Sequence, residues 1–195
     1  MAISTDLIKE LRDKTGVSVM QCRKALEETG GDMEKALLIL KKKSAEIAEK
    51  KGDRELGAGA VASYVHGKGA VGAMVELFSE TDFVSNNPEF QALAHDIAMQ
   101  VAASNPEFVS VDDVTPEAKA KMKEAFLSEV EGKPENIKEK ILEGKLRSYF
   151  EERVLLELPF VKNPDQKIKD LIQSAVQKFG ERIVVGKMAR FSIRK

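Results

Sequence analysis

The chain has 195 residues, of which 43% are hydrophobic, so it can bury a core in one or two domains. Its 31 Lys and Arg residues nearly balance its 32 Asp and Glu residues, and the net charge of −1 excludes a global basic field that would attract nucleic acid. The single cysteine, Cys22, excludes a disulfide framework within one chain. The N-terminus lacks the basic flank and apolar core of a signal peptide, and no apolar run reaches membrane-spanning length. These features predict a cytoplasmic protein that binds neither membranes nor nucleic acid directly.

The N-terminal segment has the pattern of three short helices. The first helix is expected to end at Gly16. Ser18 and Gln21 have the spacing of a capping box, which would open the second helix. Asp32 can cap the third, in which apolar residues recur at helical spacing. We therefore predict a compact three-helix module over residues 1–52.

Two side chains of the second predicted helix take opposite positions. Cys22 falls on the inner apolar face, where a small buried hydrophobic residue is a better interpretation than a nucleophile. Met20 falls outside this face, so we expect it to be exposed. Methionine is a common soft contact at interfaces, which makes Met20 a candidate for binding a partner.

The period of the sequence changes beyond a charged helical tail. Residues 53–59 are rich in glycine and charged residues and are interpreted as a linker, so we place the domain boundary there. Alternation over residues 61–65 and β-type residues over 70–78 predict two strands. Residues 67–72 between them spell the dinucleotide-binding pattern GxGxxG. No helix follows this pattern, so we interpret it as a hairpin turn.

The rest of the predicted core, residues 60–195, combines helices with a final strand. An apolar stripe after Pro88 predicts a helix that covers one face of the sheet. Three further helices are expected, opening at residues 115–117, 134 and 163–166. Residues 182–194 are β-rich and are expected to add a strand beside the hairpin. The fold class is therefore α+β, with a helical module followed by a small antiparallel sheet of about three strands and packed helices.

One polar segment, Glu80 to Asn87, joins the second predicted strand to the helix that follows it. Asn87 can cap this helix while Pro88 takes its first position, where no backbone donor is wasted. With both ends fixed, Asp82 and Phe83 would be presented to a partner, because a rigid exposed aromatic fits well into a partner's pocket. The alternative interpretation is that Phe83 folds back onto its own core.

The sequence contains no convincing catalytic constellation. His66 and His95 do not have a metal-ligand spacing, and His95 lies off the apolar stripe of its helix. Asp82 with Glu80 could form an acid–base pair, but no apolar pocket is implied that would separate their pKa values. We therefore predict a binding protein without covalent chemistry, cofactor or metal, and not an enzyme.

Several segments together resemble the elongation factor Ts family. They are LRDKTG at residues 11–16, MQCRKAL at 20–26, GD at 31–32, ETDFV at 80–84, AASNPEF at 102–108 and LPFV at 158–161. The match covers essentially the whole chain, and the combination is specific although each segment alone is weak. The resemblance implies a ubiquitin-associated-like fold for the helical module.

The resemblance also implies a function. It indicates a guanine-nucleotide exchange factor for the GTPase elongation factor Tu in translation. The segment that would dislodge the partner's Mg²⁺ consists of Thr81, Asp82, Phe83 and Val84. Arg12 and Met20 would dock the GTPase domain, and His66 would contact another domain of the partner.

Two departures from the family pattern qualify this resemblance. Val17-Ser18-Val19 replaces a small-glycine-methionine run, so Val19 is not assigned as a contact. The chain also has one hairpin-plus-helix module where longer members carry two and an inserted helical hairpin. This short form tends to pair with itself, which implies a homodimer that forms a 2:2 complex with the partner. A small sheet with open edges favours the same conclusion.

Two other classes of function remain open at this point. A ubiquitin-associated-type adaptor would use the helical module to bind a modifier, but it leaves Asp82 and Phe83 unexplained. A small hydrolase would use His66 and a carboxylate.

Overall fold

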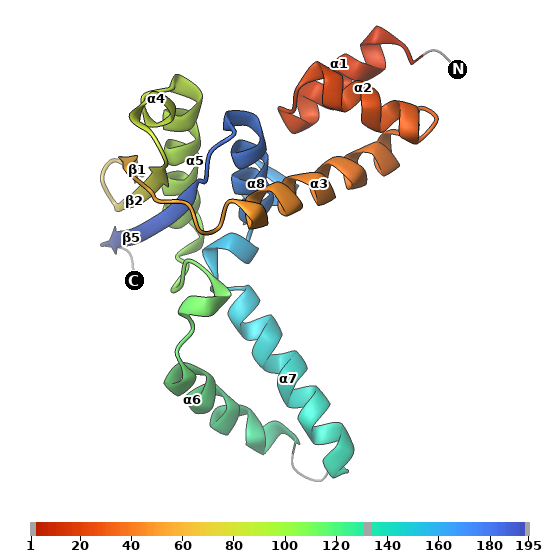
Figure 1. Cartoon of the computed structure of the whole chain (residues 1–195). Helices are drawn as coiled ribbons and strands as arrows, with labels where there is room; N and C mark the ends of the chain where they lie inside the picture. Colours follow the sequence, from red (N-terminus) through yellow and green to blue (C-terminus); the bar gives the residue numbers. More distant parts are fainter. Residues whose placement is uncertain (1–2, 131–133, 194–195) are drawn as a thin grey trace.

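The computed structural model describes residues 3–130 and 134–193, and its N-terminal part is a bundle of three helices (Figure 1). They are α1 (Thr5–Thr15), α2 (Val19–Glu28) and α3 (Met33–Lys50). Ser18 Oγ accepts a hydrogen bond from the Gln21 amide, and Asp32 Oδ1 accepts one from the Lys35 amide at 3.0 Å. Gly16 ends α1 with φ = +67°, a conformation that costs glycine little. Ser18 and Asp32 cap their helices and Cys22 is buried, as predicted, but only the Ser18 half of the capping box is formed because the Gln21 side chain accepts a hydrogen bond from Gln177.

A three-stranded antiparallel sheet forms the centre of the larger part of the chain. It contains β1 (Ala58–His66), β2 (Val71–Ser79) and β5 (Val184–Ser192), in the order β1-β2-β5. Gly67 and Gly69 have positive φ in the β1–β2 turn, as expected for a hairpin rather than a dinucleotide-binding loop. The predicted α+β class and the third strand are confirmed.

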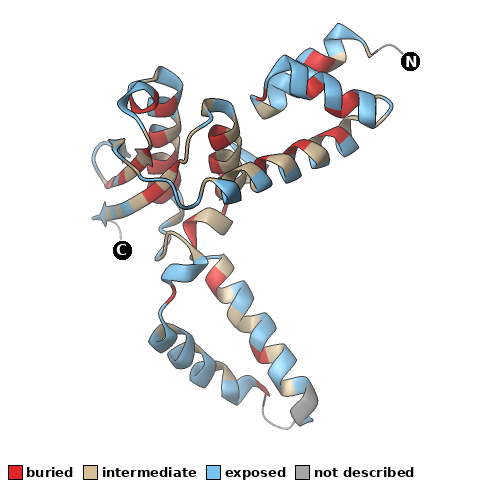
Figure 2. Cartoon of the chain, viewed as in Figure 1, coloured by how far each residue is buried: buried red, intermediate tan, exposed pale blue. Residues whose placement is uncertain are grey.

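Two helices supply the rest of the core on one face of this sheet. Helix α5 (Pro88–Ser104) lies across β1 and β2, and α8 (Ile168–Phe179) packs its apolar side into the same cluster. The rings of Phe90 and Phe179 meet edge to face with centroids 6.3 Å apart. Figure 2 shows the buried residues gathered where α5, α8 and the sheet meet. Among the described residues, Val61, Val65, Met74 and Phe191 leave the opposite face of the sheet exposed.

Helices α6 (Pro116–Leu127) and α7 (Glu135–Glu151) form an arm that projects away from the sheet (Figure 1). Short 3₁₀ turns flank the arm at Val111–Asp113, Ser128–Val130 and Leu155–Glu157. A small cluster of Val114, Phe150 and Val154 anchors its base. The chain therefore has a projecting helical pair, although the resemblance associated an inserted helical hairpin with longer members.

The expectation that residues 163–166 cap a helix is wrong. Asn163–Lys167 form a short strand, β4, which pairs with β3 (Pro159–Phe160). Helix α8 begins at Ile168, whose amide donates to the Leu158 carbonyl, and Asp170 accepts from the Lys167 amide. The backbone pairing with β3 competes successfully with the local capping signal of Asn163 and Asp165.

Helix α3 belongs to both parts of the chain. Its first half packs in the N-terminal bundle, whereas Ile47 and Ala48 pack against the cluster under the sheet. Lys41 forms an ion pair of 3.2 Å with Asp170 of α8. The division into 1–52, 53–59 and 60–195 remains a prediction, and the structure adds that β1 begins at Ala58. Helices in the described ranges are all too short or too polar to cross a bilayer.

Candidate functional site

The segment between β2 and α5 is a single helical turn, α4 (Asp82–Ser85), and not an irregular loop. Val84 and Ser85 face the core and are buried, which turns Phe83 outward. The side chain of Phe83 is 83% exposed, so it does not fold back onto the core. An aromatic ring held this far into solvent is the most conspicuous apolar feature of this end of the molecule.

The N-terminal side of α4 is held from a distant part of the chain. Glu181, just beyond α8, accepts hydrogen bonds from the Thr81 amide at 3.0 Å and from the Thr81 hydroxyl at 2.6 Å. The Ser79 hydroxyl donates to the Thr81 carbonyl at 2.9 Å. Thr81 is therefore held through its amide, its hydroxyl and its carbonyl.

Glu80 makes a second connection to the same distant segment. Its carboxylate accepts hydrogen bonds from the Arg182 amide and from the Arg54 guanidinium, the latter at 3.0 Å. Partial desolvation, which would raise the pKa of Glu80, is outweighed by these bonds, so the pKa lies below its ordinary value. Glu80 is thus an ionised structural group rather than a proton donor.

The C-terminal side of α4 is held by local bonds. The Gln91 side-chain amide donates to the Ser85 carbonyl at 2.6 Å, and Asn87 Oδ1 accepts from the Glu89 amide at 2.8 Å. Pro88 occupies the first turn of α5, as expected. With both sides held, α4 presents Asp82 and Phe83 in one orientation. Together with Asn86 and Asn87 they line an open depression at the surface.

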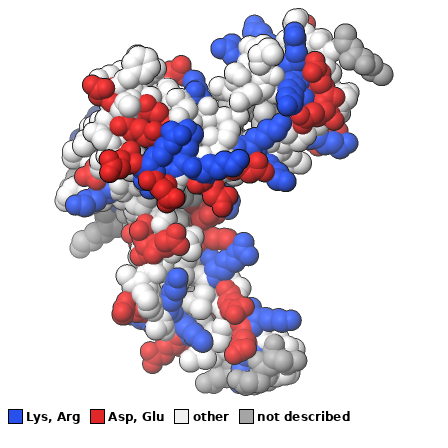
Figure 3. Space-filling view, viewed as in Figure 1, with Lys and Arg blue, Asp and Glu red and all other residues white. Residues whose placement is uncertain are grey.

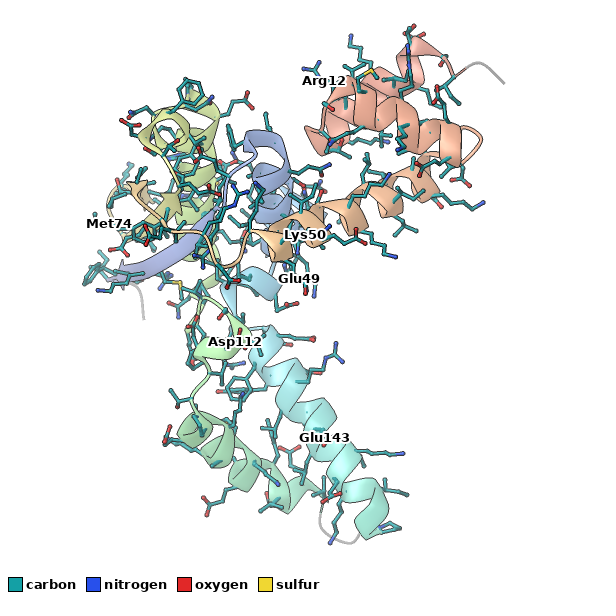
Figure 4. The ribbon with its side chains drawn as sticks, in the orientation of Figure 1. Arg12, Glu49, Lys50, Met74, Asp112 and Glu143 are labelled. Atoms are coloured by element: carbon teal, nitrogen blue, oxygen red, sulfur yellow. The ribbon has the colours of Figure 1, made fainter. Side chains whose placement is uncertain are left out.

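Arg12 and Met20 lie on the N-terminal bundle. Arg12 is exposed in the last turn of α1 (Figure 4), and Met20 is 71% exposed in the first turn of α2, as predicted. The end of α1 lies close to the start of α5, because a small cavity of about 170 Å³ is lined by Gly16 on one side and Glu89 on the other. The bundle and α4 therefore border the same side of the molecule.

His66 lies apart from these residues. It is exposed at the end of β1, where its Nδ1 lies 3.2 Å from the Tyr64 hydroxyl. In the β1–β2 register, His66 faces Val71 whereas the strand end next to α4 pairs Ala58 with Ser79. Eight residues of strand separate the two ends, which corresponds to roughly 26 Å. The structure therefore places His66 at the opposite end of the sheet from Phe83.

The groups considered for catalysis are not assembled into a reactive site. Burial raises the pKa of the Cys22 thiol, and a hydrogen bond with Thr15 only partly opposes this effect. His95 meets the ring of Tyr64 edge to face, with the ring centroids 5.6 Å apart. Within the described residues, no three His, Cys, Asp or Glu side chains gather in a way that could hold a metal ion.

Sequence reasoning missed the groups that hold α4 from a distance. Glu181, Arg182 and Arg54 were not singled out, because nothing in a single sequence links position 81 with position 181. Gln91 lies six positions after Ser85, a spacing that predicts no contact within one helix, and its bond to the Ser85 carbonyl depends on the angle between α4 and α5. Charged side chains of both signs are interspersed on the face shown in Figure 3, which agrees with the balanced composition.

The chain combines a small helical bundle with an exposed aromatic side chain on a fixed helical turn, features that are typical of a binding protein. The family described as elongation factor TS matches residues 42–195. The chain is similar to elongation factor Ts of Thermodesulfovibrio yellowstonii, with 50% identity over 194 residues that cover 99% of this chain and 97% of that protein. It is similar to elongation factor Ts of Coprothermobacter proteolyticus, with 47% identity and 99% coverage of both chains. The factor of Thermotoga petrophila is 48% identical over 99% of this chain and 97% of that protein. The chain belongs to the elongation factor Ts family of translation elongation factors.

Proposed function

We propose that the chain is a guanine-nucleotide exchange factor that releases GDP from elongation factor Tu in the cytoplasm. In this proposal the segment of Thr81, Asp82, Phe83 and Val84 acts on the Mg²⁺ site of the GTPase, with Asp82 and Phe83 reaching the partner while the buried Val84 anchors the turn. Arg12 and Met20 dock its nucleotide-binding domain, and His66 contacts a second domain. The factor performs no covalent chemistry and uses no cofactor of its own.

The exposure of Phe83 on a fixed turn carries this proposal. A free aromatic side chain in water is unfavourable, and its burial in a partner would contribute about 2 kcal/mol or more. Because α4 is already ordered, little conformational entropy is lost when Phe83 enters a partner. The neighbouring Asp82 carboxylate is exposed and can compete with the partner's own ligands for Mg²⁺ or accept hydrogen bonds from them.

The expected mechanism follows from the electrostatics of nucleotide binding. Mg²⁺ neutralises phosphate charge and accounts for much of the affinity of a P-loop protein for its nucleotide. A protein that stabilises the metal-free and nucleotide-free state must weaken nucleotide binding, and nucleotide must weaken the complex in return. Such a factor accelerates exchange in both directions and does not choose between GDP and GTP.

The separation between His66 and Phe83 is consistent with a partner of more than one domain. A partner that reaches both residues must extend along β1, from the α4 end of the sheet to the hairpin end. The N-terminal bundle adds a third area of contact at Arg12 and Met20. Contact areas spaced this widely favour a large GTPase over a small modifier protein.

We further propose that the chain forms a homodimer through the uncovered face of its sheet. Large apolar side chains alternate outward along all three strands: Val61, Val65, Met74 and Phe191 are each 50% or more exposed. Figure 4 labels Met74, which lies on the central strand β2. A second copy placed face to face on this surface would bury it and complete a two-fold sandwich. A dimer with two such exchange modules would bind two GTPases in a 2:2 complex.

The test is release of a fluorescent GDP analogue from elongation factor Tu in the presence of excess unlabelled GDP. Stopped-flow traces are recorded with and without the chain. The proposal expects a rate that rises with the concentration of the chain and saturates. An unchanged release rate at saturating concentration would refute it.

A further inference from the structure

The N-terminus of α4 lacks the side-chain cap that its sequence offers. Thr81 occupies the N-cap position, where a threonine hydroxyl ordinarily accepts a hydrogen bond from a backbone amide of the first turn. In this structure Thr81 makes no such bond, and its hydroxyl instead donates to Glu181 at 2.6 Å. The local cap has been exchanged for a tertiary bond to a residue 100 positions away.

The two chain segments exchange bonds in both directions. Glu181 accepts from the amide and hydroxyl of Thr81, while Glu80 accepts from the Arg182 amide. Hydrogen bonds to a carboxylate are about twice as strong as those between neutral groups, and a bidentate pair also fixes direction. The paired residues 80–81 and 181–182 therefore set the angle at which α4 leaves the sheet.

The same segment also holds the N-terminal bundle. Gln177 lies in the last turn of α8. Its side-chain amide donates a hydrogen bond of 2.9 Å to the side chain of Gln21. Its oxygen accepts a hydrogen bond from Ser44 of α3. The chain then turns at Gly180, with φ = +73°, into Glu181. One short segment, 177–182, thus holds both the helix that carries Met20 and the turn that carries Phe83.

We propose that Glu181 is a positioning residue for Phe83. It does not touch the partner but holds the α4 turn at the angle from which Phe83 and Asp82 reach the nucleotide site. This inference rests on the proposed exchange function. A misplacement of about 1 Å at a reacting group can cost on the order of a hundredfold in rate, so even partial loosening of α4 is measurable.

The variants are Glu181→Ala, Glu181→Gln and a control, Glu55→Gln. The control removes one exposed carboxylate from the segment before β1. The first readout is the maximal rate of GDP release at saturating factor, with the half-saturating concentration and the melting temperature. Glu181→Ala is expected to lower the maximal rate on the order of tenfold, to leave the half-saturating concentration at its wild-type value and to lower the melting temperature by no more than a few degrees. Glu181→Gln is expected to have a maximal rate between those of Glu181→Ala and the wild type, because its amide oxygen can still accept one of the two hydrogen bonds from Thr81. The control is expected to match the wild type.

Two further measurements separate positioning from a general structural effect. When Mg²⁺ is chelated, the rate defect of Glu181→Ala is expected to disappear, since no metal remains to be displaced. Thr81→Val removes the hydroxyl bond to Glu181 but keeps the amide bond, so it should lower the maximal rate about as far as Glu181→Gln and cause no further loss in the Glu181→Ala background. Wild-type rates in both Glu181 variants, or an equal loss in rate and affinity, would overturn the inference.

The free protein gives an independent result. Amide hydrogen exchange of residues 81–85 is expected to accelerate in Glu181→Ala and not in the control, because the turn then opens locally. Unchanged protection would overturn the inference even if the wild type is an active exchange factor. If the wild type does not release GDP but protection falls, the exchange proposal fails while the role of Glu181 in ordering α4 stands.

Discussion

Gln177 in α8 donates a hydrogen bond of 2.9 Å to Gln21, the residue that follows the exposed Met20 in α2. This bond joins two residues 156 positions apart and connects the N-terminal bundle to the core. Together with the packing of Ile47 against the core, it orients the bundle relative to the sheet. The bundle is therefore not a freely hinged appendage in this structure.

Two truncations should separate the roles of α3. Removal of residues 1–40 takes away Arg12 and Met20. It keeps the hydrogen bond of Ser44 to Gln177 of α8 and the packing of Ile47 and Ala48 against the core. Removal of residues 1–52 also deletes this packing and is expected to destabilise the core by about 2 kcal/mol more, a shift of several degrees in melting temperature. Both truncated chains should bind the GTPase poorly. Undiminished exchange activity in either would assign the bundle to a different partner.

Phe83→Ala is expected to slow GDP release more than it weakens the complex. Loss of a central aromatic anchor costs about 2 kcal/mol, which corresponds to roughly thirtyfold in rate. Interaction energy that is realised only in the nucleotide-releasing state appears in the rate rather than in the initial affinity. Because the side chain is 83% exposed, the free energy of unfolding should change by less than about 0.5 kcal/mol.

Leu127→Ala is the matched control for this substitution, since Leu127 is an exposed apolar residue on the arm. It should leave the release rate and the affinity unchanged. Equal losses of rate and affinity in Phe83→Ala would show that Phe83 is only an anchor for docking.

Met74→Lys should convert a dimer into a monomer. A charge at this position would be buried at the proposed two-fold contact without a partner, which costs several kcal/mol. Val111→Lys, at a half-exposed apolar residue outside the sheet, serves as the control. Light scattering at micromolar concentration measures both masses.

The mass measured by light scattering should not change when a reducing agent is added, because the only cysteine, Cys22, is buried in the N-terminal bundle. A monomeric mass for the wild-type chain, together with intact exchange activity, would eliminate the dimer.

Acidification should loosen α4 through Glu80. The pKa of Glu80 is lower in the folded chain than in the unfolded chain, so the unfolded state binds the proton first as the pH falls. The stabilisation is complete above the ordinary pKa of about 4.3 and is lost as the pH falls through the lower folded-state value. Glu80→Gln should therefore flatten the dependence of melting temperature on pH below about pH 5.

Glu157 provides the comparison for this experiment. Its partial burial would raise its pKa, but ion pairs with Lys167 and Lys169 outweigh this effect and lower it. Glu157→Gln should flatten the dependence of melting temperature on pH over the same range. The effects of the two substitutions should be additive because the two residues lie in separate ion-pair networks. A Glu80→Gln profile identical to that of the wild type would mean that the Arg182 and Arg54 bonds do not contribute to stability.

Several local features of this protein follow from the sequence by itself. Ser18, Asp32 and Asn87 cap helices where they were expected, and the glycines at 67 and 69 turn the hairpin. The exposure of Met20 and the burial of Cys22 follow from helical periodicity. These features depend on partners a few residues away, so spacing alone is sufficient to predict them.

The tertiary structure decided the features that depend on distant partners. Asn163 and Asp165 carry a capping signal, yet pairing with β3 makes the segment a strand. Thr81 and Glu80, which precede the α4 turn, bond to Glu181 and Arg182, and the burial of Val84 and Ser85 turns Phe83 outward. The distance between His66 and Phe83 follows from the register of β1 on β2. Each of these outcomes is set by hydrogen bonds or packing between residues far apart in the chain, whose proximity exists only after the chain has folded.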